Sequence, residues 1–126
     1  MIVGMGVDIV ELDRVKSIQK KFPGRFEQKI LSPEELSGFR QPSVAYLASR
    51  FAAKEAGVKA LGTGFSQGIT MHHLKIVKSQ AGGTSLFFSG PARARFDSLG
   101  ADKVHLSLTH GRDSAVAVVI LERDEF

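Results

Sequence analysis

The first half of the chain contains apolar runs of two different periods. Residues 2–10 are almost continuously apolar, and this predicts a strand that is buried on both faces. From Glu11 onward, apolar residues recur every three or four positions, which predicts a helix that ends at Pro23-Gly24. The apolar residues of the strand are Ile2, Val3, Val7, Ile9 and Val10, and those of the helix are Leu12, Val15, Ile18 and Phe22.

Two further helices begin at residues suited to capping. Ser32-Pro33-Glu34-Glu35 places a capping serine, a proline at the first helical position and a glutamate where a capping box requires it. We expect this helix to be short and to stop at Pro42, after which Ser43 caps a helix over about 44–61. The apolar stripe of the 44–61 helix consists of Val44, Leu47, Phe51, Val58 and Leu61.

The second half of the chain combines strands with one helix. The pattern predicts strands at 69–78 and 84–89, a helix at 91–99, and a hairpin with arms 103–109 and 114–122. The resulting order, βαααββαββ, indicates an α+β fold with a mostly antiparallel sheet. Because the chain has 126 residues and contains no repeat or linker, we expect one domain over 1–126.

Composition narrows the class of protein. The chain is 43% hydrophobic and 24% charged, as ordinary globular proteins are, which argues against disorder. No apolar run approaches the roughly 20 residues that cross a membrane. The apolar start lacks a basic leader, so a first strand explains it better than a signal peptide does. Cysteine is absent, which excludes disulfides and thiolate metal sites. We therefore expect a cytoplasmic protein with no membrane partner.

Glu55 attracts attention because it falls in or beside the apolar stripe of the 44–61 helix. Burying a carboxylate is costly unless the group is paired, hydrogen-bonded or bound to a metal ion. The commoner interpretation, judged from this helix alone, is an ion pair with Lys59 one turn later. Asp8 supports a second interpretation, because aspartate is disfavoured within a strand. Two such carboxylates suggest Mg²⁺, which takes one or two of them and completes its shell with water and substrate phosphate oxygens.

Several groups near these carboxylates in the sequence could meet phosphates. Arg50, Lys54 and Lys59 share the helix of Glu55, and Gly62-Thr63-Gly64 follows it as a loop whose backbone can approach a ligand closely. His110, at the end of a predicted strand beside Thr109, is a candidate as well, although plain turn histidines are commoner.

The net charge of +4 is concentrated in one segment. Residues 14–29 contain six basic side chains and one acidic side chain, a net charge of +5. Such a patch suggests an acidic partner: nucleic acid, a phosphorylated small molecule or an acidic protein. Only Phe22 and Phe26 are available for base stacking, so an acidic protein fits better than single-stranded nucleic acid. A non-enzymatic RNA- or nucleotide-binding module remains the competing class.

Three stretches of the sequence carry a resemblance to a known family: GVDIVELDRV near the start, RFAAKEAGVKALGTG in the middle and LSLTHGRDSAVAVVIL at the end. Together they resemble holo-acyl-carrier-protein synthase, the small type of phosphopantetheinyl transferase. The resemblance implies that the chain transfers 4′-phosphopantetheine from coenzyme A to a serine of apo-acyl carrier protein in fatty acid biosynthesis. It also implies a homotrimer with sites between subunits.

The same resemblance assigns roles to individual residues. It implies that Asp8 and Glu55 bind Mg²⁺, that Lys59 contacts phosphate, and that these three residues carry the catalysis. The implied coenzyme A contacts are Arg50, Lys59, Gly62, Gly64, Thr109 and His110, and the implied contacts with the carrier protein are Arg14, Lys21 and Arg25. Two places depart from the family pattern: the turn often written Gly-Lys-Pro is Gly82-Gly83-Thr84 here, and Ser114 replaces a common tyrosine.

Overall fold

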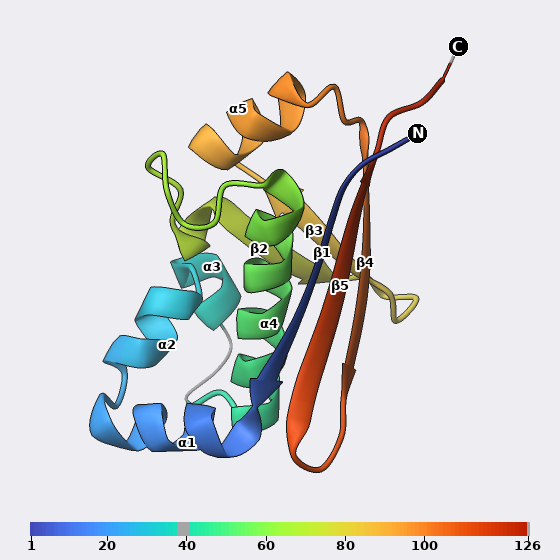
Figure 1. Ribbon diagram of the computed structural model, residues 1–126. Helices are drawn as coiled ribbons and strands as arrows, with labels where there is room; N and C mark the ends of the chain where they lie inside the picture. The colour runs from blue at the N-terminus through green and yellow to red at the C-terminus, as the bar shows by residue number, and fades with distance from the viewer. Residues whose placement is uncertain (38–40, 126) are drawn as a thin grey trace.

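A long central helix packs against a three-stranded antiparallel sheet on one side and shorter helices on the other (Figure 1). The computed structural model describes residues 1–37 and 41–125. Strands β1, β5 and β4 form the sheet in that order, and β2 pairs with β3 in a separate hairpin. The strands are β1 (Ile2–Glu11), β2 (Leu74–Lys78), β3 (Thr84–Phe88), β4 (Lys103–His110) and β5 (Ser114–Glu122). The helices are α1 (Leu12–Lys21), α2 (Arg25–Ile30), α3 (Pro33–Leu36), α4 (Val44–Leu61), η1 (Met71–His73) and α5 (Gly90–Ser98).

The predicted α+β class and mostly antiparallel pairing are confirmed, while three local predictions need correction. The short helix α2 was missed, because it follows Gly24 without a capping side chain and has only six residues. The strand predicted over 69–78 begins only at Leu74, after the 3₁₀ turn η1. Helix α3 ends at Leu36, and the rest of the helix expected to run toward Pro42 includes residues 38–40, which lie outside the described residues.

The capping residues behave as the sequence predicts. The Ser32 side chain accepts a hydrogen bond from Glu35 N, and Glu35 Oε1 accepts one from Ser32 N, which completes a capping box. The hydroxyl of Ser43 accepts from Tyr46 N at 3.1 Å and starts α4. No helix in the described part of the chain is both long and apolar enough to cross a membrane.

Helix α4 is buried almost all round, beyond the single stripe that the sequence predicts. Its small residues Ala52, Ala56 and Ala60 are buried together with Leu47 and Val58. The sheet covers one side of α4, and α2, β2 and α5 contact other parts of its surface (Figure 1). A helix enclosed in this way needs small side chains where neighbouring backbones approach, because packing is as dense as in a crystal.

Glycine lets β1 lie directly on α4. A Cβ atom built on Gly6 would stand 2.0 Å from Ala56 O, and one on Gly4 would stand 2.2 Å from Ala60 O. Only residues without a side chain permit that approach. The contact places Asp8, two residues after Gly6 and on the same face of the strand, beside the C-terminal half of α4.

The opposite face of β1 is exposed in the single chain, so the prediction that both faces are buried was wrong. Met5, Val7 and Ile9 are 62%, 57% and 65% exposed. Their partners on β5, Ile120, Val118 and Val116, extend the same apolar surface and are half-buried. The described part of the chain provides no layer on this side of the sheet (Figure 1).

Candidate active site

Two of the predicted site residues meet directly where β1 crosses α4. Lys59 Nζ lies 2.9 Å from Asp8 Oδ1 and also donates to Val7 O at 3.2 Å. The Asp8 side chain is 16% exposed and that of Lys59 is 51% exposed, so the pair borders solvent. The hydrogen bond from Asp8 raises the pKa of Lys59, so the ammonium stays charged at neutral pH.

Glu55 lies one turn before Lys59 on α4 and is half-buried. Burial raises the pKa of its carboxyl and the nearby Asp8 carboxylate raises it further, while Lys59 and Arg14 act in the opposite direction. The expected ion pair between Glu55 and Lys59 is not among the ion pairs of the described residues, where Lys59 pairs with Asp8 instead. Two acidic side chains, Asp8 and Glu55, therefore lie close together, which suits a positively charged ligand.

Asp8 and Glu55 fit a Mg²⁺ ion that is bound partly by the protein and partly by a substrate. Among the described residues, no three histidine, cysteine, aspartate or glutamate side chains are grouped closely enough to hold a metal ion by themselves. Two neighbouring carboxylates are nevertheless what Mg²⁺ takes when substrate phosphates and water complete its octahedron. Asp8 and Glu55 therefore suit an ion that arrives with a phosphorylated substrate.

A cleft of about 470 Å³, called the Arg50 cleft below, brings together Arg50, Thr109 and His110. Arg50 is 9% exposed, and its guanidinium lies 4.3 Å from the centre of the Tyr46 ring. Arg50 Nη1 donates to Ser49 Oγ at 3.2 Å, whereas its buried Nε has no hydrogen-bond partner among the described residues. Lys78, which sequence reasoning did not single out, also lines this cleft. Two cations and an unused buried donor suit an anion here.

Glu55 and the Arg50 cleft lie on different sides of α4. Arg50 precedes Glu55 by five residues, which separates their directions by about 140° around a helix of 3.6 residues per turn. Within one chain, the residues predicted to hold coenzyme A are therefore divided between two places: Lys59 lies beside Asp8 and Glu55, whereas Arg50, Thr109 and His110 form the other cleft.

The glycine-rich loop after α4 acts first as a helix cap. Gly62 adopts φ 76°, a left-handed conformation that glycine favours, and its N–H donates to Lys59 O. The N–H groups of Thr63 and Gly64 donate to Val58 O. These three N–H groups are bonded within the chain and are not free to bind a ligand. The contact of Gly62 and Gly64 with coenzyme A therefore stays a prediction.

The prediction that Lys54 of α4 could contact phosphate was wrong. Lys54 was considered for a phosphate contact, yet it is completely buried and bonded to Glu35 Oε1 at 2.7 Å and to Ile30 O at 2.6 Å. The apolar residues around Lys54 in the sequence indicated that it could be buried, and a lysine on the buried side of a helix requires a buried partner. The sequence did not reveal which glutamate supplies it.

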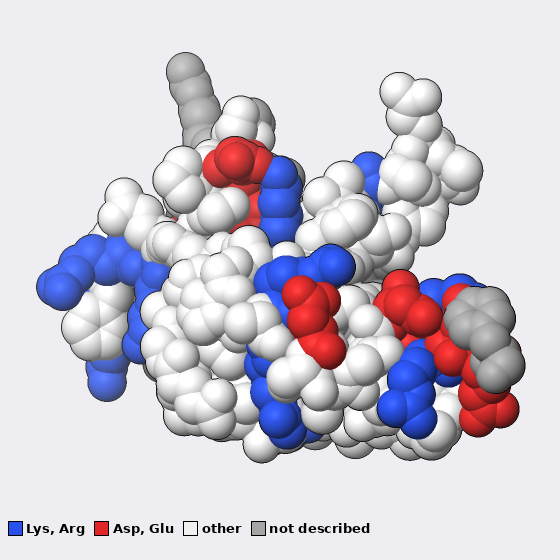
Figure 2. Space-filling view, turned by 90° about the horizontal axis from the view of Figure 1, so that it is seen from above, with Lys and Arg blue, Asp and Glu red and all other residues white. Residues whose placement is uncertain are grey.

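The predicted carrier-binding residues Arg14, Lys21 and Arg25 are all exposed on α1 and α2. Seen from above, basic side chains gather at the end of the molecule where α1 and α2 lie, whereas acidic and basic groups mix near the C-terminus (Figure 2). A cleft of about 480 Å³ lies within this surface and is lined by Ile18, Phe22, Arg25, Phe26, Lys29 and Phe51.

A larger apolar cavity continues toward Glu55. It measures about 600 Å³ and shares Phe26, Lys29 and Phe51 with the cleft beside Arg25. Glu55 lines one part of it, and residues 65 and 69–72 line another. The basic surface, the apolar cleft and the carboxylates of the candidate site are thus neighbours along α2 and α4.

Several known proteins are similar to this chain in both sequence and fold. A holo-[acyl-carrier-protein] synthase of Maridesulfovibrio salexigens is 51% identical over 124 residues, covering 98% of this chain and all of the relative. The crystal structure of the synthase from Neisseria meningitidis is 40% identical, with a TM-score of 0.88 over 98% of this chain and 100% of that one. A Bacillus anthracis synthase in complex with CoA (3′,5′-ADP) is 34% identical, with a TM-score of 0.78 over 98% of this chain and 99% of that one.

The family model covers nearly the whole chain. The model of the 4′-phosphopantetheinyl transferase superfamily matches residues 4–119. This range includes Asp8 on β1, Glu55 and Lys59 on α4, and Thr109 and His110 on β4. The resemblance inferred from the three sequence stretches is thereby confirmed. The chain belongs to the 4′-phosphopantetheinyl transferase superfamily and is an enzyme of that family.

Proposed function

We propose that this enzyme transfers 4′-phosphopantetheine from coenzyme A to a serine of apo-acyl carrier protein, with Mg²⁺, for fatty acid biosynthesis. The observation that carries the proposal is the meeting of Asp8 and Lys59, with Glu55 one turn away, at the crossing of β1 and α4. Relatives that carry the synthase name, and one solved in complex with CoA (3′,5′-ADP), support the choice of substrates.

Asp8 and Glu55 would hold Mg²⁺ together with the pyrophosphate of coenzyme A. When bound, the ion would neutralise charge on the phosphoryl group and on the departing bisphosphate. Lys59 is charged and half-exposed beside Asp8, so it can turn its ammonium toward the same phosphate oxygens. Positioning and charge stabilisation supply most of the acceleration in phosphoryl transfer.

The serine hydroxyl of the carrier attacks the β-phosphorus of coenzyme A. A new bond joins the serine oxygen to phosphorus, the bond to the bridging oxygen breaks, and adenosine 3′,5′-bisphosphate leaves with that oxygen. The serine proton needs an acceptor, and Glu55 is our candidate. Its carboxylate is half-buried beside Asp8 and one turn from Lys59, where the phosphorus of coenzyme A would be held.

The Arg50 cleft of a neighbouring subunit would complete the site. Arg50 is buried with an unused donor, and Lys78 lies beside it, so the cleft suits the phosphate at the adenosine end of coenzyme A. Because Arg50 and Glu55 point in different directions on α4, one chain alone does not join the Arg50 cleft to the carboxylates of the candidate site. The exposed apolar face of β1 and β5 is the surface that a second copy would cover, and we propose a homotrimer formed in this way.

The carrier protein would dock on α1 and α2. Arg25 lines an apolar cleft that continues into the cavity beside Glu55, and Arg14 and Lys21 are exposed on the neighbouring helix α1. An acidic partner is attracted by the cations, while its apolar residues fill the cleft, as is usual for an interface with an apolar centre and a charged rim. Arg14 is close enough to Glu55 to lower the pKa of that carboxyl, so this surface reaches the catalytic group.

The decisive experiment weighs the carrier protein. The purified chain is incubated with coenzyme A, MgCl₂ and an apo-acyl carrier protein, and intact-mass spectrometry follows the carrier. We expect a gain of one phosphopantetheine group, and no gain when EDTA replaces the metal. Glu55→Gln should abolish the gain, whereas Glu125→Gln, at an exposed glutamate beyond β5, should leave it intact. An unmodified carrier in every reaction would refute the proposed function.

A further inference from the structure

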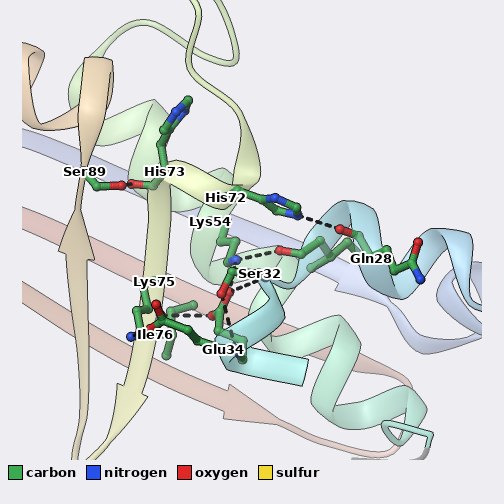
Figure 3. Close-up of polar contacts among 11 residues, drawn as sticks. Gln28, Ser32, Glu34, Lys54, His72, His73, Lys75, Ile76 and Ser89 are labelled. Atoms are coloured by element: carbon green, nitrogen blue, oxygen red, sulfur yellow. Dashed lines mark hydrogen bonds and ion pairs between the residues drawn. The ribbon is translucent and has the colours of Figure 1, made fainter. Parts of the chain in front are cut away.

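A buried ion pair holds the short helices α2 and α3 against α4. Lys54, from the middle of α4, is completely buried and donates to Glu35 Oε1 of α3 at 2.7 Å. Its ammonium also donates to Ile30 O, the last carbonyl of α2, at 2.6 Å (Figure 3). One side chain thereby ties the end of one helix and the side of another to the central helix.

Glu35 extends the connection to the chain on either side. Its Oε1 accepts from Ser32 N at 3.0 Å, within the link between α2 and α3, and its Oε2 accepts from Ile76 N of β2 at 3.1 Å. The carboxylate therefore meets three elements: α4 through Lys54, the start of α3 through Ser32 and β2 through Ile76 (Figure 3). Each of these bonds joins a charged group to a partner, which makes it stronger than a neutral hydrogen bond.

The segment held in this way forms one wall of the cavity beside Glu55. Phe26 and Ile30 of α2 line that cavity, and Phe51 and Glu55 of α4 line it from the other side. Lys54 precedes Glu55 in the sequence, so the residue that fixes the α2 wall is adjacent to the residue proposed for catalysis. His72 Nε2 donates to Gln28 O at 2.5 Å and holds the last turn of α2 from a third direction (Figure 3).

Stability alone does not account for such a pair. Removing two charges from water costs free energy that their attraction repays only when geometry and hydrogen bonding are favourable, and apolar residues of similar volume are often equally stabilising. The ion pair does supply direction, because Lys54 reaches one carbonyl and one carboxylate oxygen while Glu35 uses both of its oxygens. It fixes where α2 ends relative to α4.

We infer that Lys54 and Glu35 are positioning residues that set the carrier-docking face of α2 relative to Glu55. The inference rests on the proposed function, since it assumes that the carrier protein docks beside Arg25 and Phe26. Lys54 has no exposed surface and does not touch a substrate; it acts through Ile30 and the α2 wall. The residues proposed to hold coenzyme A are Asp8, Glu55, Lys59 and those of the Arg50 cleft, and none of them lies on α2 or α3.

The test separates binding of the two substrates. In the double variant Lys54→Met with Glu35→Gln, both charges are removed together, so no uncompensated charge is left buried. We expect the KM for the carrier protein to rise by roughly tenfold or more, because the loss of one well-packed contact at a docking surface has an effect of about this size. The Kd for coenzyme A, measured by calorimetry, should stay within about twofold of wild type. Affinity for a carrier whose acceptor serine is alanine should fall in parallel with the change in KM.

A second variant, Glu35→Asp, tests the same role if the double variant does not fold. Glu35→Asp keeps the opposite charges but shortens the acidic side chain, so it pulls on the junction while leaving Lys54 a partner. It should raise the carrier KM severalfold with little change in coenzyme A affinity. The control is Lys75→Met with Glu34→Gln, which removes an exposed ion pair between β2 and α3 that does not touch α2, and its carrier KM should match wild type.

The possible outcomes are distinguishable. If wild-type protein does not transfer phosphopantetheine, the proposed function fails before the variants are compared. If wild type is active and Glu35→Asp, or a folded double variant, binds the carrier as wild type does, the positioning role is refuted. Equal losses of carrier and coenzyme A binding would also refute it, because they would show that the pair supports the whole fold and not the docking face.

Discussion

Gly6→Ala tests whether the close contact of β1 with α4 builds the candidate active site. The added Cβ would stand 2.0 Å from Ala56 O and 2.8 Å from Ala60 N, whereas ordinary contacts begin near 3.4 Å. The obstacle is helix backbone, which cannot rotate out of the way as a flexible side chain can. Strand β1 must therefore move by about 1.4 Å, if the whole shift is taken along the Ala56 contact.

Two effects of different size follow from that displacement. Overpacking of this kind costs about 1–3 kcal/mol of unfolding free energy, which urea denaturation followed by circular dichroism will measure. Asp8 moves with β1 and away from Lys59, whose Nζ lies 2.9 Å from it in the native protein. A shift near 1 Å at a phosphoryl-transfer site lowers the rate by about 100-fold. Activity should thus fall by far more than the loss of folded protein explains.

Gly83→Ala provides the matched control. A Cβ at Gly83 would meet its nearest atom, Ser79 Oγ, at 3.7 Å, an ordinary contact, so both stability and transfer should remain close to wild type. If Gly6→Ala unfolds at the wild-type urea concentration and transfers phosphopantetheine at the wild-type rate, β1 does not need this approach to α4. That result would overturn our account of how Asp8 reaches Lys59.

Three further predictions concern charge and assembly. Because burial and Asp8 raise the pKa of Glu55 above its ordinary 4.5, the native state keeps a proton that the unfolded chain releases, and stability falls as pH rises through the window just above 4.5. Glu55→Gln should therefore be more stable than wild type at pH 7 without metal, with the difference closing below about pH 4.5 in thermal melts; a less stable variant at pH 7 would contradict the desolvation argument. Ile9→Glu should reduce the mass measured by light scattering to that of a monomer, whereas Phe87→Glu, at an equally exposed apolar residue of the other sheet, should not. Reversing Arg14 and Lys21 to glutamate should weaken carrier binding most at low salt and leave coenzyme A affinity unchanged, and an unaltered carrier KM would remove these residues from the docking surface.

Local chemistry made much of the fold predictable. The Ser32 capping box, the Ser43 cap and the final hairpin all depend on neighbouring residues, so the sequence alone located them. Helix α2 escaped because its start depends on Gly24 and not on a capping side chain, and its six residues are too few for a clear period. Short elements of this kind are stabilised by packing more than by propensity.

The candidate site was predictable in its members but not in its pairing. Asp8 and Glu55 stood out as carboxylates in apolar surroundings, and the family resemblance joined them to Lys59. The sequence favoured an ion pair within α4, between Glu55 and Lys59, because helical neighbours are the only partners visible along one chain. In the structure Lys59 turns to Asp8 instead, since two glycines bring another strand within reach of its ammonium.

Sequence alone therefore determined most of the helices and strands, the two carboxylates in apolar surroundings and the basic segment, all of which follow from residue type and short-range spacing. Tertiary structure decided three further features: Lys54 is buried against Glu35 and not exposed to phosphate, the coenzyme A candidates divide between the Asp8–Lys59 pair and the Arg50 cleft, and one face of β1 is uncovered. These outcomes depend on which distant segments pack together. Packing is set by the shape and volume of the whole core, and no local window of sequence contains that information.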